Sequence, residues 1–424
     1  MDRDVHLAYG TGGLTVALPA DRTTVVEPRW EETVTDPRAV LLGALRRPVA
    51  GSPLRERVRP GQTVAVSVCD VTRPQPRELM LRALLEELEG ITRLEDVVVL
   101  VATGTHRANT DAELRAMLGD ELVDTLRIVN HDARDASSLT WMGTFGDGVP
   151  LWLDSEWVQA DVRITTGFVE PHFFAGFSGG PKMIVPGLAG LDTVLVLHDA
   201  SHIGHPEARW GVIEGNPVHD DVRACAAATG CDFALDVVLN REQGIVAAFG
   251  GDLFAMHAQA RERSRSIAMA PVPHEFEVVL TTNSGFPLDQ NLYQAVKGMS
   301  AGATVVREGG VIVCAAECRD GFPDHGSYRQ VLASQPSPRA LFDEIAARAR
   351  TVPDQWQVQV QTKIQMRARV GVHSGNLSDD DLRSAHLEPV GDIAAFVGEA
   401  LGQAGPQARV CVLPEGPQTI PYLV

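Results

Sequence analysis

Short apolar runs, rich in β-branched residues, alternate along the chain with segments in which apolar residues recur every three or four positions. The runs have the length of strands, and the segments between them have the periodicity of helices. Strands that are apolar on both faces and separated by helices are typical of a parallel sheet covered on both sides. In the first part of the chain the predicted strands are 63–70, 96–104, 126–132 and 161–169, and a helix is predicted at 77–91.

The same alternation returns in the last third of the chain, after a segment (261–274) that is rich in Arg and Ser and contains two prolines. Such a composition is typical of a domain boundary. The pattern therefore predicts two α/β domains, residues 1–270 and 271–424, with largely parallel sheets that face an interdomain active-site cleft. Ligands of such sheets bind at the carboxyl ends of the strands. The predicted strands here are 276–285, 309–317 and 408–414, and the helices are 291–303, 338–350 and 391–402.

The composition is that of an ordinary folded protein. Of its 424 residues, 44% are hydrophobic and 22% are charged, which leaves room for roughly two or three domains with cores of their own. The 37 basic and 55 acidic side chains give a net charge of −18. A nucleic acid is therefore not an expected partner, and an anionic substrate would need a local basic pocket.

Membrane segments and disulfides are not expected either. No window approaches the ~18 consecutive apolar residues that span a bilayer, and residues 1–30 contain Asp and Arg where a signal peptide is apolar. The six cysteines lack CxxC spacing, so we expect them to be reduced and mostly buried. These features predict a cytoplasmic protein without a membrane partner; an oligomer is compatible with them.

Polar and basic residues follow two predicted strands at the points where the strands end. Asp70 and Arg73, in CDVTRPQP, follow the first strand; the carboxylate accepts hydrogen bonds, and the guanidinium can bind a carboxylate or phosphate through two parallel bonds. Thr105 and His106, in ATGTHR, follow the next strand, where small residues let a ligand approach the backbone. An ordinary turn and a solvated loop histidine are the alternative interpretations.

The stretch 170–187, EPHFFAGFSGGPKMIVPG, is predicted to be the centre of an active site. His172 follows a strand, Ser178 and Gly179 belong to a turn of small residues, and Lys182 comes directly after that turn. A Gly-Gly turn followed by lysine is similar to a phosphate-binding turn, although the motif GxxxxGK[ST] is absent. The apolar residues after Lys182 predict a partly buried and more nucleophilic amine.

Three histidines follow in LHDASHIGHPEARWG. His198 and His202 have the i, i+4 spacing of two metal ligands on one helix face, and His205 or Glu207 would have to complete a zinc site. Two other interpretations stay open, namely helix histidines without a function and a single metal-binding histidine.

A further polar group follows the predicted boundary. Tyr293, Gln294 and Lys297 fall on one turn of a predicted helix, and the last two share a face because they are spaced i, i+3. A neutral donor beside a cation suits a 2-hydroxy carboxylate, whereas a solvated helix face is the simple alternative. Trp356 would line the same pocket or pack in a core.

Taken together, these segments resemble the lactate racemase family, whose members use a nickel-pincer nucleotide. The resemblance extends from YGTGGLTVALP (9–19) to PEGPQTIPY (414–422), and its most specific part is the spacing of His172, Lys182 and His198. It implies a racemase or epimerase that inverts C2 of a 2-hydroxy acid, either lactate or a related compound.

The resemblance also implies roles for individual residues. Lys182 matches the lysine that is linked covalently to the pyridinium-3-thioamide-5-thiocarboxylic acid mononucleotide. His198 matches the protein ligand of Ni(II), whose other donors are two sulfurs and a ring carbon of the cofactor. His106 and His172 match the two acid–base histidines, whereas His202 and His205 match no catalytic residue. The other assignments are Asp70, Thr105, Ser178 and Gly179 to the cofactor, and Arg73, Tyr293, Gln294, Lys297 and Trp356 to the substrate.

The implied reaction explains why two histidines are needed. The hydroxyl proton passes to one histidine while the C2 hydride moves to the nickel-pincer nucleotide, and a 2-keto acid forms transiently. Return of the hydride to the opposite face inverts the centre, so near-neutral imidazoles are required for both directions. The proteins that synthesise the cofactor are implied partners.

Two other classes of protein compete with a racemase. A nicotinamide-dependent 2-hydroxy-acid dehydrogenase should contain GxGxxG after a strand, and this chain does not. A non-catalytic nickel-cofactor carrier would need Lys182 and His198 but not the paired histidines. The substrate stays open, because Phe173, Phe174 and Phe177 would either narrow the pocket for an apolar side chain or face the core.

Overall fold

The computed structural model describes residues 2–323 and 326–424, which fold into two compact units. Unit 1 comprises Met1–Arg29, His198–Trp210 and Ser266–Val424, and unit 2 comprises Trp30–Leu197 and Gly211–Arg265. This interleaved division differs from a single boundary after residue 270. The physical reason is that strand β3 (Thr23–Val25) pairs with a C-terminal strand, and the segment His198–Trp210 packs on a C-terminal helix.

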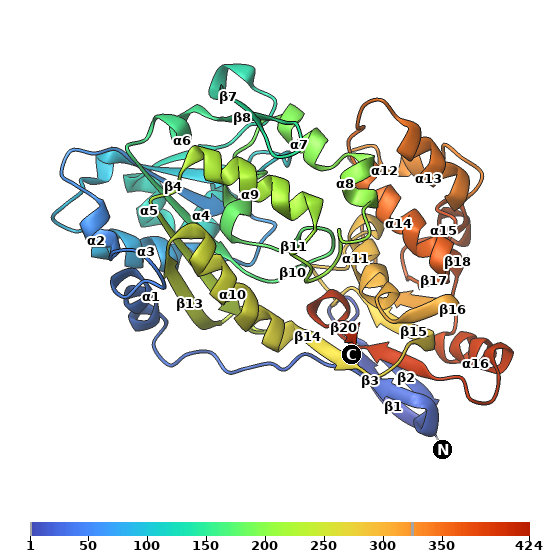
Figure 1. Ribbon diagram of the computed structural model, residues 1–424. Helices are drawn as coiled ribbons and strands as arrows, with labels where there is room; N and C mark the ends of the chain where they lie inside the picture. Colours follow the sequence, from blue (N-terminus) through green and yellow to red (C-terminus); the bar gives the residue numbers. More distant parts are fainter. Residues whose placement is uncertain (1, 324–325) are drawn as a thin grey trace. The chain divides into compact units, whose positions relative to one another are not determined.

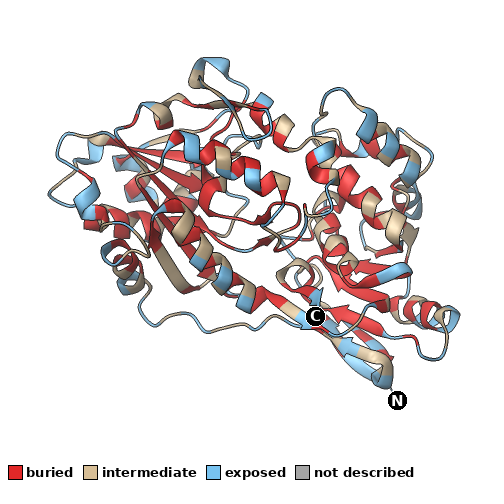
Figure 2. Ribbon diagram, viewed as in Figure 1, coloured by how far each residue is buried: buried red, intermediate tan, exposed pale blue. Residues whose placement is uncertain are grey.

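Unit 2 is built on a six-stranded sheet with the order β13-β12-β9-β4-β5-β6 (Figure 1). All neighbours are parallel except β13, which runs antiparallel to β12. Strands β4 and β5 are buried almost throughout (Figure 2), which confirms the prediction that both faces of this sheet are covered. The bounds are β4 Val64–Cys69, β5 Val97–Ala102, β6 Arg127–Asn130, β9 Val162–Phe168, β12 Phe233–Leu239 and β13 Ile245–Gly251.

The two faces of this sheet have different partners. Val64, Val66 and Val68 face an apolar core that also contains residues of α1, α3 and α4. Ser67 points to the other face, where its hydroxyl donates to the carbonyl of Met183 (2.7 Å). The remaining elements of unit 2 are α1 Pro37–Arg46, α2 Leu54–Arg57, α3 Arg77–Glu87, η2 Leu94–Asp96, α4 Asp111–Leu118, α5 Asp120–Thr125, η3 Ala136–Ser138, β7 Leu139–Phe145, β8 Val149–Asp154, α6 Ser155–Gln159, β10 Pro171–His172, β11 Gly176–Phe177, η4 Gly180–Met183, α7 Leu191–Leu197, α9 Pro217–Thr229 and α10 Leu253–Ala268.

Unit 1 contains a second six-stranded sheet, β18-β17-β16-β15-β19-β3, in which all neighbours are parallel. The hairpin β1–β2 packs its apolar residues on this sheet, together with α16. The strands are β1 Asp2–Leu7, β2 Leu14–Pro19, β14 Met269–Val272, β15 Phe276–Thr282, β16 Val306–Ala315, β17 Arg369–His373, β18 Glu388–Pro389, β19 Val410–Leu413 and β20 Ile420–Leu423.

Five helices of unit 1 begin at a capping side chain, namely α8, α11, α13, α15 and α16. Asn291, for example, accepts the N–H of Gln294 (3.1 Å) and so begins α11. No helix in the described part of the chain is long and apolar enough to cross a membrane. The helices are η1 Ala20–Arg22, α8 Ala200–Gly204, α11 Leu292–Ala303, α12 Tyr328–Leu332, α13 Pro338–Ala347, α14 Gln355–Arg367, α15 Asp379–Ser384, α16 Ile393–Ala404 and η5 Gly416–Gln418.

Candidate active site

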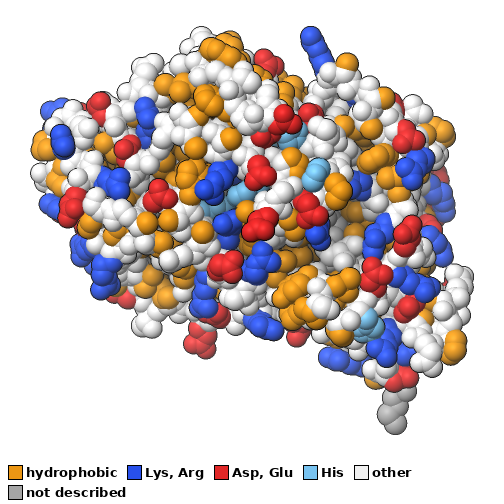
Figure 3. Space-filling model, viewed as in Figure 1, with side chains coloured by type: hydrophobic (Ala, Val, Ile, Leu, Met, Phe, Trp, Pro, Cys, Tyr) orange, Lys and Arg blue, Asp and Glu red, His pale blue; other side chains and the backbone are white. Residues whose placement is uncertain are grey.

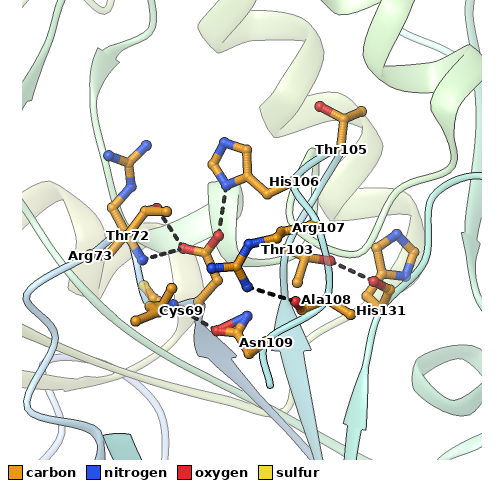
Figure 4. Close-up of polar contacts among 12 residues, drawn as sticks. Cys69, Thr72, Arg73, Thr103, Thr105, His106, Arg107, Ala108, Asn109 and His131 are labelled. Carbon is orange, nitrogen blue, oxygen red and sulfur yellow. Dashed lines mark hydrogen bonds and ion pairs between the residues drawn. The ribbon is translucent and has the colours of Figure 1, made fainter. Parts of the chain in front are cut away.

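The first pair of site residues lies at the carboxyl end of the unit 2 sheet. Cys69 of β4 lies opposite Ala102 of β5 in a parallel ladder, so the segments that follow these strands leave the sheet at the same edge. His106 Nδ1 is 2.6 Å from Asp70 Oδ2 (Figure 4). Asp70 is buried, whereas half of the His106 side chain is exposed. A carboxylate on Nδ1 favours the tautomer with the proton on Nδ1, which leaves Nε2 able to accept a proton.

Asp70 is kept ionised by its hydrogen bonds. Burial alone would raise its pKa, but hydrogen bonding from His106 and Thr72 outweighs burial, and the pKa is lowered. The Thr72 hydroxyl and N–H both donate to Asp70 Oδ1, at 2.7 and 3.2 Å. The carboxylate is therefore a fixed acceptor for the His106 ring.

Arg73 and Thr105 occupy the same two loops. Arg73 is half-buried and contributes to the lowered pKa of Asp70, and Figure 4 shows the side chains of Arg73 and His106 extending in the same direction from their loops. Thr105 precedes His106, and its carbonyl accepts a bond from Arg134 (3.1 Å). Thr105 is thus near the Asp70–His106 pair, although its side chain makes no contact drawn in Figure 4.

Two residues that the sequence analysis did not single out hold the Asp70–Arg73 turn in place. The buried Arg77 donates through Nε to the carbonyl of Cys69 (2.7 Å) and also to the carbonyl of Asp70. Gln75 accepts the N–H of Cys69 (2.7 Å). Gln75 lies in a proline-rich segment and Arg77 begins the helix that follows it. These two polar residues were the signal in the sequence that could have pointed to them.

His172 lies on a short hairpin formed by β10 and β11, in which it is paired with Gly176. Its Nδ1 accepts the N–H of Ala175 (3.2 Å), and its Nε2 is 3.5 Å from Lys182 Nζ. An accepting Nδ1 places the proton of a neutral ring on Nε2. His172 and His106 therefore favour opposite tautomers.

Lys182 lies in η4, directly after the Ser178–Gly180 turn, and is half-buried. Its Nζ lies 5.6 Å from the centre of the Phe174 ring. The predicted partial burial is confirmed. The amine therefore lies beside an aromatic ring and an imidazole.

The Ser178–Gly180 turn is fixed from two sides by residues that the sequence analysis missed. Asp236 Oδ2 accepts the N–H of Gly180 (2.6 Å), and His257 Nε2 is 2.8 Å from the carbonyl of Ser178. A Cβ on Gly179 would lie 2.6 Å from Asp236 Oδ2. The turn is therefore a packed element, and the Gly180 N–H donates to protein rather than being aimed at a phosphate.

Ser178 itself joins the ends of the hairpin. Its hydroxyl donates to the carbonyl of Phe168 (3.0 Å) and accepts the N–H of Glu170 (2.9 Å).

Asp236 could have been found in the sequence, because it is an aspartate within the otherwise apolar strand FALDVVL. Burial raises the pKa of Asp236 to about 7, although the bond from Gly180 opposes that rise.

A separate group of site residues lies in unit 1. The indole N–H of Trp356 donates to the hydroxyl of Tyr293 (3.1 Å), which links α14 to α11. The ring centres of Trp356 and His198 are 5.0 Å apart. Gln294 and Lys297 share α11 with Tyr293, and both are half-buried. Unit 1 thus brings His198 and these α11 and α14 residues onto neighbouring elements.

The interpretation of His198 and His202 as two ligands on one helix is wrong. Helix α7 ends at Leu197 and α8 begins at Ala200, because Asp199 caps α8 by accepting the N–H groups of Ser201 and His202, both at 2.9 Å. His202 is buried, and its Nδ1 lies 2.9 Å from the same carboxylate oxygen. His205 Nδ1 accepts the N–H of Glu207 (3.2 Å). These bonds explain His202 and His205 as structural residues.

Helix α14 also anchors the segment that follows His198. Gln359 Nε2 donates to the carbonyl of Ala200 (2.8 Å), and Lys363 Nζ donates to the carbonyls of Ile203 (3.2 Å) and Gly204 (3.3 Å). Burial lowers the pKa of Lys363. A cation at the last carbonyls of a helix is favourable, so α8 is bound at both ends.

The three phenylalanines near His172 are buried. Phe177 lies in the core of unit 2 with 1% of its surface exposed. Phe173 and Phe174 lie 5.0 and 4.5 Å from the His172 ring, centre to centre, the second edge-on. Their contacts favour a role in packing around the imidazole.

The donors present fit a metal that arrives with ligands of its own. Among residues 2–323 and 326–424, no group of three or more His, Cys, Asp or Glu side chains could hold a bare metal ion. A nickel-pincer nucleotide brings three donors, so the protein needs to supply one imidazole. A covalently linked cofactor also needs an amine to form the link. His198, half-buried beside the Trp356 ring, could supply the imidazole, and the half-buried Lys182 could supply the amine.

The fold and these pairs of interacting polar groups define an α/β enzyme equipped for acid–base chemistry. A family model described as the lactate racemase N-terminal domain matches residues 9–211, and one described as the lactate racemase C-terminal domain matches residues 272–420. The chain belongs to the lactate racemase family, and its class is therefore isomerase.

Individual relatives agree with the family match. Lactate racemase from Thermoanaerobacterium thermosaccharolyticum is 33% identical over 423 residues, which cover 98% of this chain and 99% of that protein. Lactate racemase from Lactiplantibacillus plantarum is 33% identical over 375 residues, 88% of each chain. Both matches cover most of this chain and most of the relative.

Solved structures show the same fold. The lactate racemase apoprotein from T. thermosaccharolyticum superposes with a TM-score of 0.93 at 32% identity, over 99% of this chain and 100% of that one. A protein from Thermotoga maritima has a TM-score of 0.67 at 16% identity, over 93% and 100% of the two chains, and supports the fold alone.

Proposed function

We propose that this protein is a racemase that inverts C2 of a 2-hydroxy acid, with lactate as the first substrate to test. The observation that carries the proposal is the opposite hydrogen bonding of two histidines. His106 is bonded through Nδ1 to a carboxylate, whereas His172 accepts a backbone N–H at Nδ1. The unprotonated Nε2 of His106 can take a proton, and His172 can give one once its ring is protonated; a reaction on two faces of one carbon requires both steps.

The substrate carboxylate would be bound by the basic residues of the site. Arg73 can form two parallel bonds to a carboxylate, and Lys297 supplies a second positive charge. Gln294, Tyr293 and Trp356 would complete the pocket around the hydroxyl and the carbon chain. The predicted active-site cleft between the two domains stays part of this proposal.

The cofactor would be held by Lys182 through a covalent link and by His198 as the protein ligand of nickel. When bound, the nickel-pincer nucleotide would accept and return the hydride of C2. The proposed cofactor contacts are Asp70, Thr105, Ser178 and Gly179. Asp70 contacts His106, Thr105 directly precedes His106, and the other two lie shortly before Lys182. In support, the Asp236 and His257 bonds fix the turn before Lys182 and so limit where its amine can reach.

Proton transfer is the task of the two histidines. His106 would take the hydroxyl proton of one enantiomer at Nε2, and Asp70 would stabilise the imidazolium that forms. In the reverse direction His172 would take the hydroxyl proton of the other enantiomer. In each direction, the histidine that did not take this proton would give one to the product. Cofactor-synthesising proteins are the proposed partners.

An intact-mass and nickel measurement tests the proposal. The protein should be produced together with cofactor-synthesising enzymes and then assayed with lactate by chiral analysis. We expect a mass increment that Lys182→Ala loses and a nickel content that His198→Ala loses. The chain has only three lysines, Lys182, Lys297 and Lys363, and the control Lys363→Arg should keep the increment.

Several outcomes would contradict the proposal. Full racemisation by unmodified, nickel-free protein would reject the cofactor assignment. A loaded protein that racemises no 2-hydroxy acid would favour a carrier of the cofactor.

A further inference from the structure

Basic side chains from α9 and α10 meet in unit 2, close to the turn that precedes Lys182. The rings of His219 on α9 and His257 on α10 lie 6.3 Å apart, centre to centre, with their planes 23° apart. The Arg223 guanidinium of α9 lies over the Phe254 ring of α10, 4.5 Å from its centre. These two contacts place α9 and α10 side by side (Figure 1), and Figure 3 shows basic, acidic and histidine side chains intermingled over this part of the molecule.

Arg261 extends this row. It is four residues after His257 and so lies on the same face of α10. Its Nε is buried from solvent and has no hydrogen-bond partner in the described part of the chain. Within the same ranges, Arg223 and Arg261 form no ion pair, and the His219 ring forms no hydrogen bond. A buried guanidinium nitrogen without an acceptor is uncommon and costly, which points to an absent anion.

The positive charges in this cluster act on one another. Burial and then the charges of Arg261, Arg223 and Lys182 lower the pKa of His219 to about 4. Burial and then the charge of Arg223 lower the pKa of Arg261, although Glu262 opposes this. At neutral pH the His219 ring is therefore neutral and keeps one N–H donor.

Nearby carboxylates form no ion pair with Arg223 or Arg261 in the described part of the chain. Asp221 is buried and accepts the N–H of Asp147 (2.8 Å). Asp220 and Glu262 are exposed, so water screens their charge. The positive end of the α9 dipole, at Pro217, adds to the field of the arginines.

We propose that His219, Arg223 and Arg261 form a phosphate-binding site between α9 and α10 of unit 2. Two guanidinium groups and one imidazole N–H supply donors and charge for a tetrahedral oxyanion. The ligand class is a phosphate group, carried either by the nucleotide cofactor or by a separate small molecule.

The site is connected to the turn that precedes Lys182. His257 packs on this turn, because a Cβ on Gly180 would lie 2.4 Å from its ring, and its Nε2–H donates to the carbonyl of Ser178 (2.8 Å). A bound phosphate would therefore lie behind the turn that carries the reactive amine. This connection rests on the proposed function, whereas phosphate binding does not.

Titration of the unloaded full-length protein with inorganic phosphate, followed by calorimetry and phosphorus NMR, tests the site. We expect saturable binding that Arg261→Gln weakens at least about tenfold, the effect of losing one charge-assisted hydrogen bond. Arg261→Lys should retain part of the affinity. Arg339→Gln, which removes an exposed arginine of α13, is the matched control and should bind like the wild type.

A second variant and a second protein form complete the test. Arg223→Gln changes an exposed residue, so it should fold normally and also weaken binding. Equal affinity of wild type, Arg223→Gln and Arg261→Gln, or no saturable binding by wild type, would overturn the proposal. If cofactor-loaded protein no longer binds phosphate, the cofactor's own phosphate fills the site; retained binding assigns it to a separate ligand. Neither result depends on racemase activity.

Discussion

The N–H of Gly180 donates to Asp236 at 2.6 Å, two residues before Lys182, and the second carboxylate oxygen of Asp236 has no partner among the described residues. Asp236 is completely buried in β12, and burial raises its pKa to about 7. The residue that fixes the Lys182 turn is therefore an acid that titrates near neutral pH. The consequence can be measured as a dependence of stability on pH.

Asp236→Asn should remove part of the pH dependence of stability. With a raised pKa, the folded protein keeps a proton on Asp236 that the unfolded chain loses above about pH 4. The wild type is therefore expected to lose up to about 4 kcal/mol of unfolding free energy from this group as the pH rises from about 4 to about 7. Asparagine is neutral throughout and still offers an oxygen to Gly180.

Thermal unfolding of both proteins across this pH range measures the effect. The melting temperature of Asp236→Asn relative to wild type should rise between pH 4 and pH 7 and then level off. Asp232→Asn removes a half-exposed carboxylate that also accepts a backbone N–H, from Arg163, and controls for loss of such a bond. A constant difference between Asp236→Asn and wild type would show that Asp236 is ionised in the folded protein.

His106→Ala and His172→Ala should each abolish racemisation in both directions, because either direction needs one histidine to take a proton and the other to return one. Losses of roughly a hundredfold or more are expected for each. Chiral analysis starting separately from each lactate enantiomer is the measurement, with nickel content and cofactor mass as controls for loading. Full activity of either variant would remove that histidine from the mechanism.

Asp70→Asn should lower kcat while leaving KM nearly unchanged. The carboxylate holds the Nδ1–H of His106 at 2.6 Å, whereas an amide can present its NH2 group there and favour the wrong tautomer. We expect a loss of roughly a hundredfold in kcat. Asp70→Glu, which keeps the charge, should recover part of it, and an equal loss in Asp70→Asn and Asp70→Glu would indicate a purely structural role.

Lys363→Met should weaken the retention of nickel without touching a proposed ligand. It removes the two bonds from Lys363 to the carbonyls at the end of α8, the helix that follows His198. Changes to residues that orient a metal ligand typically cost about 10- to 100-fold in metal affinity. Nickel content after dialysis against a chelator, at equal cofactor mass, is the readout.

Lys363→Arg and Gln365→Ala sharpen this test. Arginine can still donate to the α8 carbonyls and should retain more nickel than methionine. Gln365 lies on the same helix but donates to the carbonyls of Ala385 and His386, so its loss should leave nickel retention unchanged. If Lys363→Met retains nickel as well as Gln365→Ala does, the bonds to α8 do not position His198.

The strands and most long helices were predictable because their signals are local. β4, β5 and β9 are buried on both faces, and α11 and α13 lie within the predicted helices 291–303 and 338–350. The interpretation in which His198 and His202 share one helix was wrong, because Asp199 caps a new helix, α8, between them. Helical spacing alone does not distinguish an aspartate that caps a new helix from one that continues an old one.

The candidate site was predictable only in part. The strand-end positions of Asp70 and His106 follow from the order of strands, because parallel neighbours end at one edge. The contacts of Asp236 and His257 with the Lys182 turn join residues 56 and 79 positions apart, and no local pattern encodes such a pairing. The spacing of His172 and Lys182 drew attention to the Ser178–Gly180 turn but did not indicate which residues hold it.

The sequence by itself determined the α/β class, the strand-end positions of the polar residues and the family resemblance, because these depend on periodicity and on short motifs. Only the tertiary structure decided that β3 joins the C-terminal sheet, that His198 lies in the unit that contains Trp356, and that the two histidines favour opposite tautomers. The physical reason is that hydrogen bonds and packing join residues distant in the chain. Such partners are fixed by the fold as a whole.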